Sequence, residues 1–366
     1  MTVSRAGKLK SIPVTSWIVD EELDEKTRAR PGMREVAERA GVAMSSVSRV
    51  LSGHPDVSPR MRRVVMEAAR ELHYQPDMLA QGLRLGKTFS VGFAVSDIAN
   101  PVLAEIITGA EKRLRAAGYS LLLTNSEGNP ELDIEHVGLL ERRRVDGLIL
   151  SLVDEHHPDV VAALRQVACP IVLVDREIPA GLTARRAAFD HTVGMRQAMR
   201  HLLNLGHRRF ALITGGRERP ARERRQAVEE TLATVSDAEH EVYAGGFFVE
   251  HGRRATAQIL ARDPRPTAII AGGNMLMEGA LLTLKEAGIR LGRDLSFVGC
   301  DDAAVADLHE PPIAVVRRDS RAVGVAAAEL LLADLEPAGD GLEASHEIVL
   351  PTEFVARASC APPPRR

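Results

Sequence analysis

From Arg34 to Leu51 the chain reads REVAERAGVAMSSVSRVL. Apolar residues recur at helical spacing in both halves of this stretch, at residues 34–40 and again at residues 44–51. Gly41 separates the halves and can adopt the left-handed backbone conformation that often ends a helix. The stretch therefore predicts two short helices joined by a tight turn at residues 41–43.

A third helix is predicted directly after this pair. Ser58 suits the N-cap position, and Pro59 suits the first helical position, where no backbone N–H is needed. Six apolar residues then follow on one helical face, which predicts a small core shared by the three helices. They are Met61, Val64, Val65, Ala68, Ala69 and Leu72.

Beyond residue 87 the pattern changes to strand-sized apolar runs that alternate with helical patterns. Continuous apolar runs are typical of parallel strands covered on both faces, and the alternation is typical of doubly wound α/β sheets. The runs form two series, separated near residues 187–194, which predicts two lobes with a ligand cleft at the carboxyl ends of the strands. A single large sheet without a cleft is the alternative. The expected strands are 90–95, 120–125, 147–152 and 171–175, then 210–214, 267–271 and 295–300.

Composition narrows the class of protein. The formal net charge is −3, but residues 1–87 carry an excess of basic residues and the remainder an excess of acidic ones. A basic N-terminal part favours contact with nucleic acid phosphates. The longest apolar runs are far shorter than the roughly 20 residues that span a bilayer, and no signal-peptide pattern is visible. The three cysteines are widely separated, so we expect a cytoplasmic protein without a membrane partner.

Residues 34–53 closely resemble the headpiece of the lactose-repressor (LacI/GalR) family of bacterial transcription regulators. Further matches follow in the family's order, so that the resemblance covers residues 33–357. They are VSP at 57–59, AARELHYQP at 68–76, LRLGKT at 83–88, NPVLAE at 100–105, RVDGLI at 144–149, VDR at 174–176, LGHR at 205–208, VGCDD at 298–302 and PP at 311–312.

The resemblance implies an α/β protein with an N-terminal all-α helix-turn-helix headpiece, a hinge helix, and a two-lobed core of doubly wound parallel sheets like that of periplasmic binding proteins. We assign residues 1–32 to a flexible extension, 33–78 to the headpiece and 79–87 to the hinge helix or linker. Residues 88–358 form the effector-binding and dimerisation core, and 359–366 form a tail. The tail lacks leucine heptads, which favours a homodimer over a tetramer.

The function implied is that of a sequence-specific transcriptional regulator, with a repressor expected. Its homodimer would bind pseudo-palindromic operator DNA, because the symmetry of the protein and that of the site must match. A small effector, expected to be a sugar, would bind between the lobes and control operator affinity allosterically. No cofactor and no metal are implied.

The second helix would be the recognition helix in the major groove. Arg49 can donate two hydrogen bonds to guanine O6 and N7, worth about 1–3 kcal/mol in discrimination. Met44 would contact a thymine methyl group, or alternatively pack in the headpiece core. Leu83 would be a wedge in the minor groove, or alternatively a linker residue packed on the core. The expected base readers are Met44, Ser45 and Arg49, the expected phosphate contacts are Ser46, Ser48, Ser58 and Arg62, and the expected minor-groove face is Leu79, Ala80 and Leu83.

In the DNA-binding part, three positions depart from the family's usual pattern. Gly32 and Ala43 replace hydroxyl residues, so a side-chain cap on the first helix and one phosphate contact are in doubt. Gly82 lowers the helix propensity of the hinge by up to about 1 kcal/mol. We therefore expect the hinge helix to form only on DNA.

The effector residues follow from the same resemblance. Polar residues at the carboxyl ends of strands would hold ring hydroxyls, and Phe247 would stack on the face of a sugar. A nucleoside or another small metabolite remains an alternative. The expected residues are Asn100, Val102, Leu103, Asp190, Arg225, Phe247, Asn274 and Asp301.

Other classes of protein fit less well. A stand-alone sugar-binding receptor would share the two lobes, but it would carry a signal peptide and no headpiece. An α/β enzyme is disfavoured because the sequence has no nucleophile elbow, Walker loop, dinucleotide fingerprint or HExxH motif. His191, His207 and the pair at 156–157 have no metal-ligand spacing, so we expect them to be structural or solvated.

Overall fold

The computed structural model describes residues 31–51, 54–74, 86–336 and 345–364. The chain divides into two compact units, residues 1–81 and 82–366, which are described separately. Within the described residues, no helix is both long and apolar enough to cross a membrane.

The first unit contains three helices, as the sequence predicts: α1 (Met33–Ala40), α2 (Met44–Leu51) and α3 (Pro59–Glu71). Gly41 has a φ of 66° and ends α1, and Ser58 caps α3 by accepting a hydrogen bond from the backbone N–H of Met61 at 3.2 Å. Val36, Val47, Val50 and Val65 are at most 3% exposed, so one small core joins the helices. The expectation for Val64 was wrong, because this residue lies on the outer side of α3 and is 38% exposed.

The missing hydroxyl cap at Gly32 is compensated in part from inside α1. The backbone N–H of Gly32 donates to the carboxylate of Glu35 at 2.8 Å. An acidic side chain in the first turn also interacts favourably with the helix dipole. Glu35 therefore supplies half of a capping box, although Gly32 has no side chain to supply the other half.

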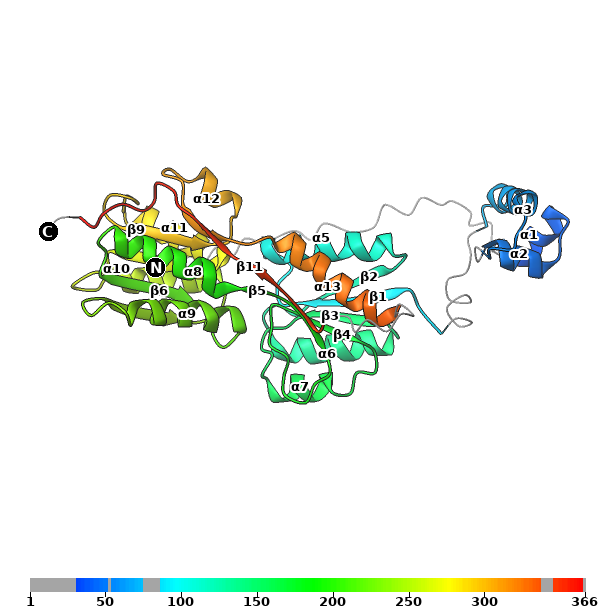
Figure 1. Ribbon diagram of the computed structural model, residues 1–366, viewed down its shortest axis with the longest axis horizontal. Helices are drawn as coiled ribbons and strands as arrows, with labels where there is room; N and C mark the ends of the chain where they lie inside the picture. Colours follow the sequence, from blue (N-terminus) through cyan, green and yellow to red (C-terminus); the bar gives the residue numbers. More distant parts are fainter. Residues whose placement is uncertain (1–30, 52–53, 75–85, 337–344, 365–366) are drawn as a thin grey trace, which may run out of the picture. The chain divides into compact units, whose positions relative to one another are not determined.

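The second unit begins with a lobe built on a parallel six-stranded sheet of strand order β11-β5-β4-β3-β1-β2. Helices α5 and α13 cover one face of this sheet, and α6 and α7 cover the other (Figure 1). The elements are β1 (Ser90–Val95), α5 (Pro101–Ala116), β2 (Ser120–Asn125), α6 (Pro130–Arg142), β3 (Gly147–Ser151), α7 (Pro158–Leu164), β4 (Ile171–Val174), β5 (Arg185–Asp190), α13 (Ser320–Leu335) and β11 (Glu347–Pro351). We call this the N-lobe.

The C-lobe repeats the plan with the strand order β12-β10-β9-β8-β6-β7, in which β12 runs antiparallel to β10. Helices α8 and α9 cover one face, and α10 and α11 cover the other. The elements are α8 (His191–Asn204), β6 (Arg209–Thr214), α9 (Arg219–Leu232), β7 (Glu239–Ala244), α10 (Val249–Leu260), β8 (Ala268–Ala271), α11 (Asn274–Glu286), β9 (Ser296–Cys300), α12 (Ala304–Leu308), β10 (Ala314–Arg317) and β12 (Glu353–Val355). The two-lobed prediction is confirmed, and the single-sheet alternative is wrong.

The chain passes between the lobes at three crossovers, namely from β5 to α8, from β10 to α13 and from β11 to β12. The first and third crossovers are hydrogen-bonded to each other. The hydroxyl of Thr352 donates to the carbonyl of Asp190 at 2.7 Å and accepts from the N–H of Gly194 at 3.0 Å. These hydrogen bonds hold the first and third crossovers side by side.

Two sequence expectations need correction. The β2 strand was expected to be covered on both faces, but it is an edge strand, and Leu122 and Leu123 are 39% and 37% exposed. Residues from 359 onward were expected to form a tail. Ser359 is instead fully buried, and its hydroxyl donates to the carbonyl of Phe297 at 2.7 Å, so the C-terminal segment is part of the C-lobe as far as Ala361.

The close contact between α5 and α13 depends on two glycines. A Cβ on Gly324 would overlap the backbone carbonyl of Ile106, and a Cβ on Gly109 would overlap that of Arg321. The two helix backbones therefore pack directly on each other.

Gly324→Ala should lower the free energy of unfolding by about 1–3 kcal/mol, because an added methyl group forces the two backbones apart. Gly138→Ala is the matched control. A Cβ on Gly138 in α6 would meet only the flexible end of Arg142, so better helix propensity should stabilise this variant by about 0.4–1 kcal/mol. Urea unfolding measures both changes, and equal effects would contradict the close-packing argument.

Candidate DNA-recognition helix and effector cleft

The α2 helix separates its residues into a buried side and an exposed side. Val47 and Val50 are buried in the headpiece core, whereas Ser45 and Arg49 are exposed. Met44 is 53% exposed, so the alternative that it is a core residue is wrong. The residues expected to read bases thus share a solvent-facing surface of one helix.

The expected phosphate contacts are placed around this helix. Ser46 and Ser48 in α2 are partly exposed, and Ser58 and Arg62 are exposed. The Ser58 oxygen accepts the capping bond, which leaves its O–H as a donor. Arg62 donates to the carbonyl of His54 at 3.3 Å. The minor-groove prediction for Leu79, Ala80 and Leu83 lies outside the described residues.

The two lobes of the core enclose a cavity of about 70 Å³ at the carboxyl ends of their strands. Both lobes contribute to its walls, and six of the eight residues expected to bind the effector lie there. They are Asn100, Val102, Leu103, Phe247, Asn274 and Asp301.

Asn100 and Asn274 join the lobes directly. The amide nitrogen of Asn274 donates to Oδ1 of Asn100 at 2.9 Å, and the same oxygen caps α5 by accepting from the N–H of Val102 at 3.0 Å. The backbone N–H of Asn274 in turn donates to Asp301 at 3.2 Å. The starts of α5 and α11 are therefore connected across the cleft.

The remaining two predicted residues lie elsewhere. Asp190 is the N-cap of α8 and accepts from the N–H and hydroxyl of Thr192 at 2.9 and 2.6 Å. Arg225 is on the outer side of α9, where it pairs with Glu229 at 2.6 Å. A shift of one residue turns a helix by about 100°, and it is the preceding Arg224, 3% exposed, that lines the cavity.

A guanidinium that was not predicted from the sequence also joins the two lobes across the cleft. Arg318, on the second crossover, pairs with Asp175 of the N-lobe at 2.7 Å and with Asp301 of the C-lobe at 2.6 Å. It lies 4.9 Å from the ring centroid of Phe189, a distance suited to a cation–π interaction. Burial alone would raise the pKa of Asp175 and of Asp301. His191, followed by Arg318 and Arg219, lowers the pKa of Asp175, and Arg318 and Arg224 lower that of Asp301, so both carboxylates are ionised at neutral pH.

Both of these aspartates have a strained backbone. Asp175 follows β4 with a φ of 54°, and Asp301 follows β9 with a φ of 73°. Left-handed conformations are uncommon for residues other than glycine and tend to occur at functional sites. Here these conformations place one carboxylate from each lobe against the guanidinium of Arg318.

His191 extends the network from the first crossover. Its Nε2 lies 2.9 and 3.0 Å from the two carboxylate oxygens of Asp175, and its Nδ1 lies 3.2 Å from a guanidinium nitrogen of Arg224. Arginine can only donate, so Nδ1 must accept and Nε2 must carry the proton. Burial lowers the pKa of His191 to about 4, which is consistent with a neutral ring.

A second set of ion pairs joins the lobes at α9. Arg219 pairs with Asp175 at 3.2 Å, and its backbone N–H donates to Glu155 at 2.9 Å. Arg222 pairs with Glu177 at 2.7 Å. Glu155 is fully buried. The guanidiniums of Arg222 and Arg176 lie 3.5 and 3.6 Å from its carboxylate oxygens and offset part of its desolvation.

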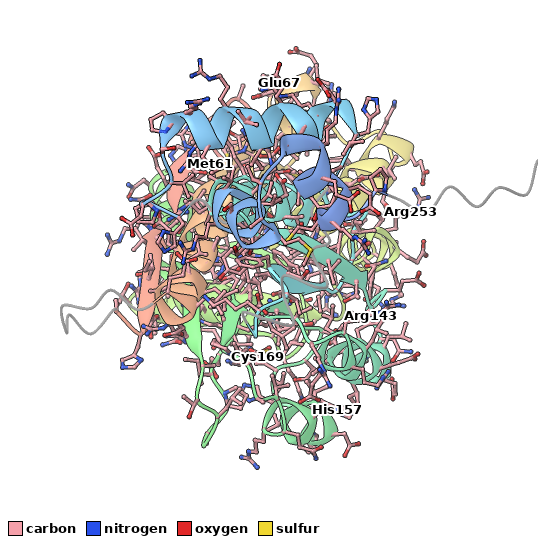
Figure 2. The ribbon with its side chains drawn as sticks, turned by 90° about the vertical axis from the view of Figure 1, so that its right-hand side faces the viewer. Met61, Glu67, Arg143, His157, Cys169 and Arg253 are labelled. Atoms are coloured by element: carbon pink, nitrogen blue, oxygen red, sulfur yellow. The ribbon has the colours of Figure 1, made fainter. Side chains whose placement is uncertain are left out.

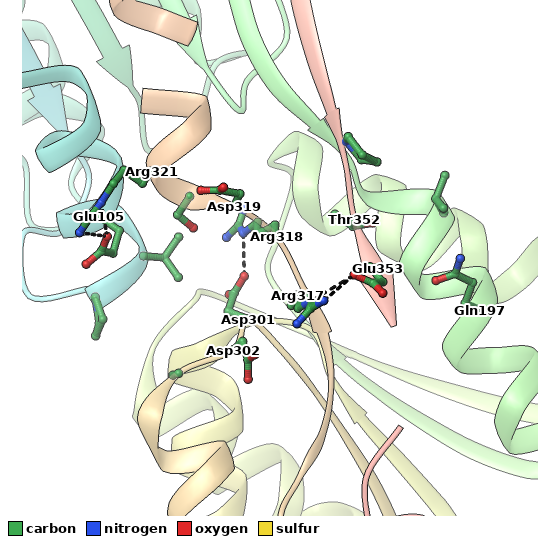
Figure 3. Close-up of a pocket in the computed structure, with 16 residues that line it drawn as sticks. Glu105, Gln197, Asp301, Asp302, Arg317, Arg318, Asp319, Arg321, Thr352 and Glu353 are labelled. Atoms are coloured by element: carbon green, nitrogen blue, oxygen red, sulfur yellow. Dashed lines mark hydrogen bonds and ion pairs between the residues drawn. The ribbon is translucent and has the colours of Figure 1, made fainter. Parts of the chain in front are cut away.

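An open groove of about 880 Å³ lies beside the cavity and shares Val102, Asp301 and Arg318 with it. Figure 3 shows Arg318 pointing to Asp301 in this groove, with the exposed pairs Arg317–Glu353 and Arg321–Glu105 nearby. Arg318 therefore stands between the groove and the cavity.

His207, His157 and Cys169 do not line the cavity. His207 is buried, and its ring nitrogens contact Thr267, Ser296 and the carbonyl of Ala361 at 2.8–2.9 Å. His157, labelled in Figure 2, lies at the N-cap of α7. Burial raises the pKa of Cys169, also labelled there, to about 11, so this thiol stays protonated.

The sequence offered partial signals for the missed residues. Asp175 and Arg176 directly follow an apolar strand and lie in a quoted family match, so their position at a strand end could have identified them. Arg219 and Arg318 lie among other charged residues, and nothing local in the sequence distinguishes them from a solvated surface. Their role depends on which residues the fold brings together.

The pKa of His191 predicts how stability depends on pH. Because the folded-state pKa, about 4, lies below the ordinary value of 6.5, the unfolded chain binds the proton first as the pH falls. Stability is then present above pH 6.5 and is lost between 6.5 and 4, by about 3 kcal/mol in total.

His191→Gln should remove this part of the pH dependence, whereas His346→Gln, which changes an exposed histidine, should retain it. Urea unfolding at several pH values between 7 and 4 measures the difference. Parallel curves for the wild type and His191→Gln would contradict the assignment.

Comparison with known proteins agrees with both units. Residues 32–77 match the model of bacterial regulatory proteins of the lacI family, and residues 199–360 match that of the periplasmic binding protein-like domain. The HTH-type transcriptional repressor PurR of Klebsiella pneumoniae (strain 342) is 32% identical over 308 residues, which cover 82% of this chain and 89% of the relative.

Solved structures give the same result. The lac repressor dimer bound to operator and the anti-inducer ONPF is 27% identical, with a TM-score of 0.79 over 90% of this chain and 99% of that one. The complex of the transcriptional regulator CelR with cellobiose is 30% identical, with a TM-score of 0.66 over 90% of this chain and 100% of that one. The chain belongs to the LacI family of bacterial regulatory proteins.

Proposed function

We propose that this protein is a transcriptional repressor whose homodimer binds pseudo-palindromic operator DNA, and whose operator affinity is changed by a small polar effector in the cleft. The observation that carries the proposal is that a single chain combines the exposed α2 surface around Arg49 with a cleft lined by charged groups from both lobes. The lac repressor and CelR structures, with operator DNA and with cellobiose respectively, support the two halves of the proposal. Because the proposed target is operator DNA, we expect the protein to act in the cytoplasm. The proposed function requires no catalytic step.

In the proposed DNA complex, α2 lies in the major groove with Met44, Ser45 and Arg49 towards the base edges. Arg49 carries most of the discrimination through its two donors to a guanine. Ser46, Ser48, Ser58 and Arg62 hold phosphates, which position the helix without reading sequence. A hinge segment with Leu79, Ala80 and Leu83 follows in the minor groove.

The proposed control is a linkage between the cleft and the DNA-binding part. Sites for small organic ligands usually have volumes of about 300–1000 Å³, far above the 70 Å³ that the closed cleft offers. A monosaccharide therefore enters this cavity only when the lobes move apart and break contacts such as Asn100–Asn274. The relative position of the lobes then depends on the effector, and operator affinity and effector affinity change reciprocally.

Arg49→Ala should weaken binding to an operator from the protein's own upstream region by about 1–3 kcal/mol while leaving binding to random DNA nearly unchanged. Arg70→Ala is the matched control, since it removes the same charge from an exposed position near the end of α3. Fluorescence anisotropy at fixed salt measures both affinities. If Arg49→Ala weakened specific and random binding equally, Arg49 would be a phosphate contact and not a base reader.

A further inference from the structure

The carboxylates of the cleft are already occupied by donors from the protein itself. In Asp175, one oxygen accepts from His191 and Arg219 at 2.9 and 3.2 Å, and the other accepts from Arg318 at 2.7 Å. In Asp301, one oxygen accepts from Arg318 at 2.6 Å and the other from the N–H of Asn274 at 3.2 Å. A ligand thus meets two aspartates in the cavity that are already paired with donors of the protein itself.

The hydrogen-bonding capacity that remains consists of donors. Arg318 uses Nε and one Nη, and its second Nη makes no hydrogen bond to any residue that the structure describes. Arg224 donates to the carbonyl of Gly272 and to His191, both of which are uncharged, and its Nε has no acceptor among the described residues. Both side chains line the cavity.

Arg224 is also a deeply buried cation without an ion pair. It is 3% exposed, and across the described part of the chain no carboxylate lies within ion-pair distance of its guanidinium. Its guanidinium carbon lies 6.0 Å from the ring centroid of Phe247, which supports a cation only weakly. A buried cation in this state favours a ligand that brings a negative charge.

We propose that the effector carries an anionic group, a carboxylate or a phosphate, that binds between Arg224 and Arg318. This rests on the proposed function and names the chemistry of its ligand. The planar N–H fork of a guanidinium matches the oxygens of these two anions in geometry and charge. A neutral polyol could accept hydrogen bonds from these guanidiniums through its hydroxyl oxygens, but it would bring no negative charge to the unpaired Arg224.

The size of the cavity agrees with an anionic group. A single water needs about 10–15 Å³ of such space, so about 70 Å³ accommodates a carboxylate or a phosphate but not a whole sugar ring. The open groove beside the cavity exposes Arg318 to solvent, so the charged end of an effector can reach this guanidinium before the lobes separate.

The test uses the full chain and three probes that differ only at carbon 6 of one sugar: D-glucose with a hydroxyl, D-glucuronate with a carboxylate and D-glucose 6-phosphate with a phosphate. Titration calorimetry at constant ionic strength should show saturable binding of at least one anion, at least about tenfold tighter than D-glucose. The two anionic arms distinguish a carboxylate from a phosphate. Equal or tighter binding of D-glucose, or no binding of either anion, would overturn the proposal.

Variants separate charge from shape. Arg224→Gln and Arg318→Gln should each abolish the preference for the anion, and Arg224→Lys, which keeps the charge, should restore part of it. Arg225→Gln is the matched control, because it removes an exposed cation one residue along α9 and should leave the preference unchanged. An anion preference that persists in both glutamine variants of the cleft would also overturn the proposal.

Operator binding by the same preparation, measured without any probe, tests the proposed function independently. Loss of specific DNA binding would reject the regulator and leave the anion titration standing. Intact DNA binding together with a neutral preference would reject the anionic effector alone.

Discussion

The core depends on one buried interaction, in which the guanidinium of Arg318 is shared between Asp175 of the N-lobe and Asp301 of the C-lobe. Two carboxylates this deeply buried would be costly if unpaired. The shared cation neutralises part of that charge while joining the two lobes, so the cleft can close without a ligand. Separation of the lobes returns the three charges to water, so closed and open arrangements can lie close in free energy.

This interaction involves residues at the crossovers between the lobes. Arg318 lies on the second crossover, and His191 is the first residue of α8, directly after the first crossover. Thr352 on the third crossover is hydrogen-bonded to Asp190 at the first crossover. A group that moves Arg318 therefore acts on the segments about which the lobes rotate. Hinge motions are absorbed by a few residues at the ends of elements, and two residues at these crossovers, Arg318 and His191, belong to the network around the cavity.

Most of the fold could be predicted from local patterns. The three headpiece helices and the seven strands singled out match the structure within one residue at either end, because helical spacing and continuous apolar runs report burial directly. Five strands were not among those expected. The edge strands β7, β11 and β12 are only partly buried, whereas β5 and β10 are interior strands with short apolar runs. The site was predicted in part: strand-end residues such as Asn100 and Asp301 were found, but Arg225 was chosen in place of Arg224, because on a helix rich in arginine only the packed structure decides which side chain faces inward.

The same reasoning explains why the cleft is built from so many charges. An apolar cleft of this area would close firmly, since buried apolar surface is regained at about 25 cal/mol per Å² whenever the lobes meet. Ion pairs contribute less free energy to closure, because desolvation cancels much of their attraction. Each contribution disappears when a ligand takes the place of one partner. A cleft closed by Asp175, Arg318 and Asp301 can thus be stable enough to define one state and still respond to a small ligand that competes for a single guanidinium. Coupling energies of about 1–3 kcal/mol, typical of allosteric proteins, are of the size that one such exchange supplies.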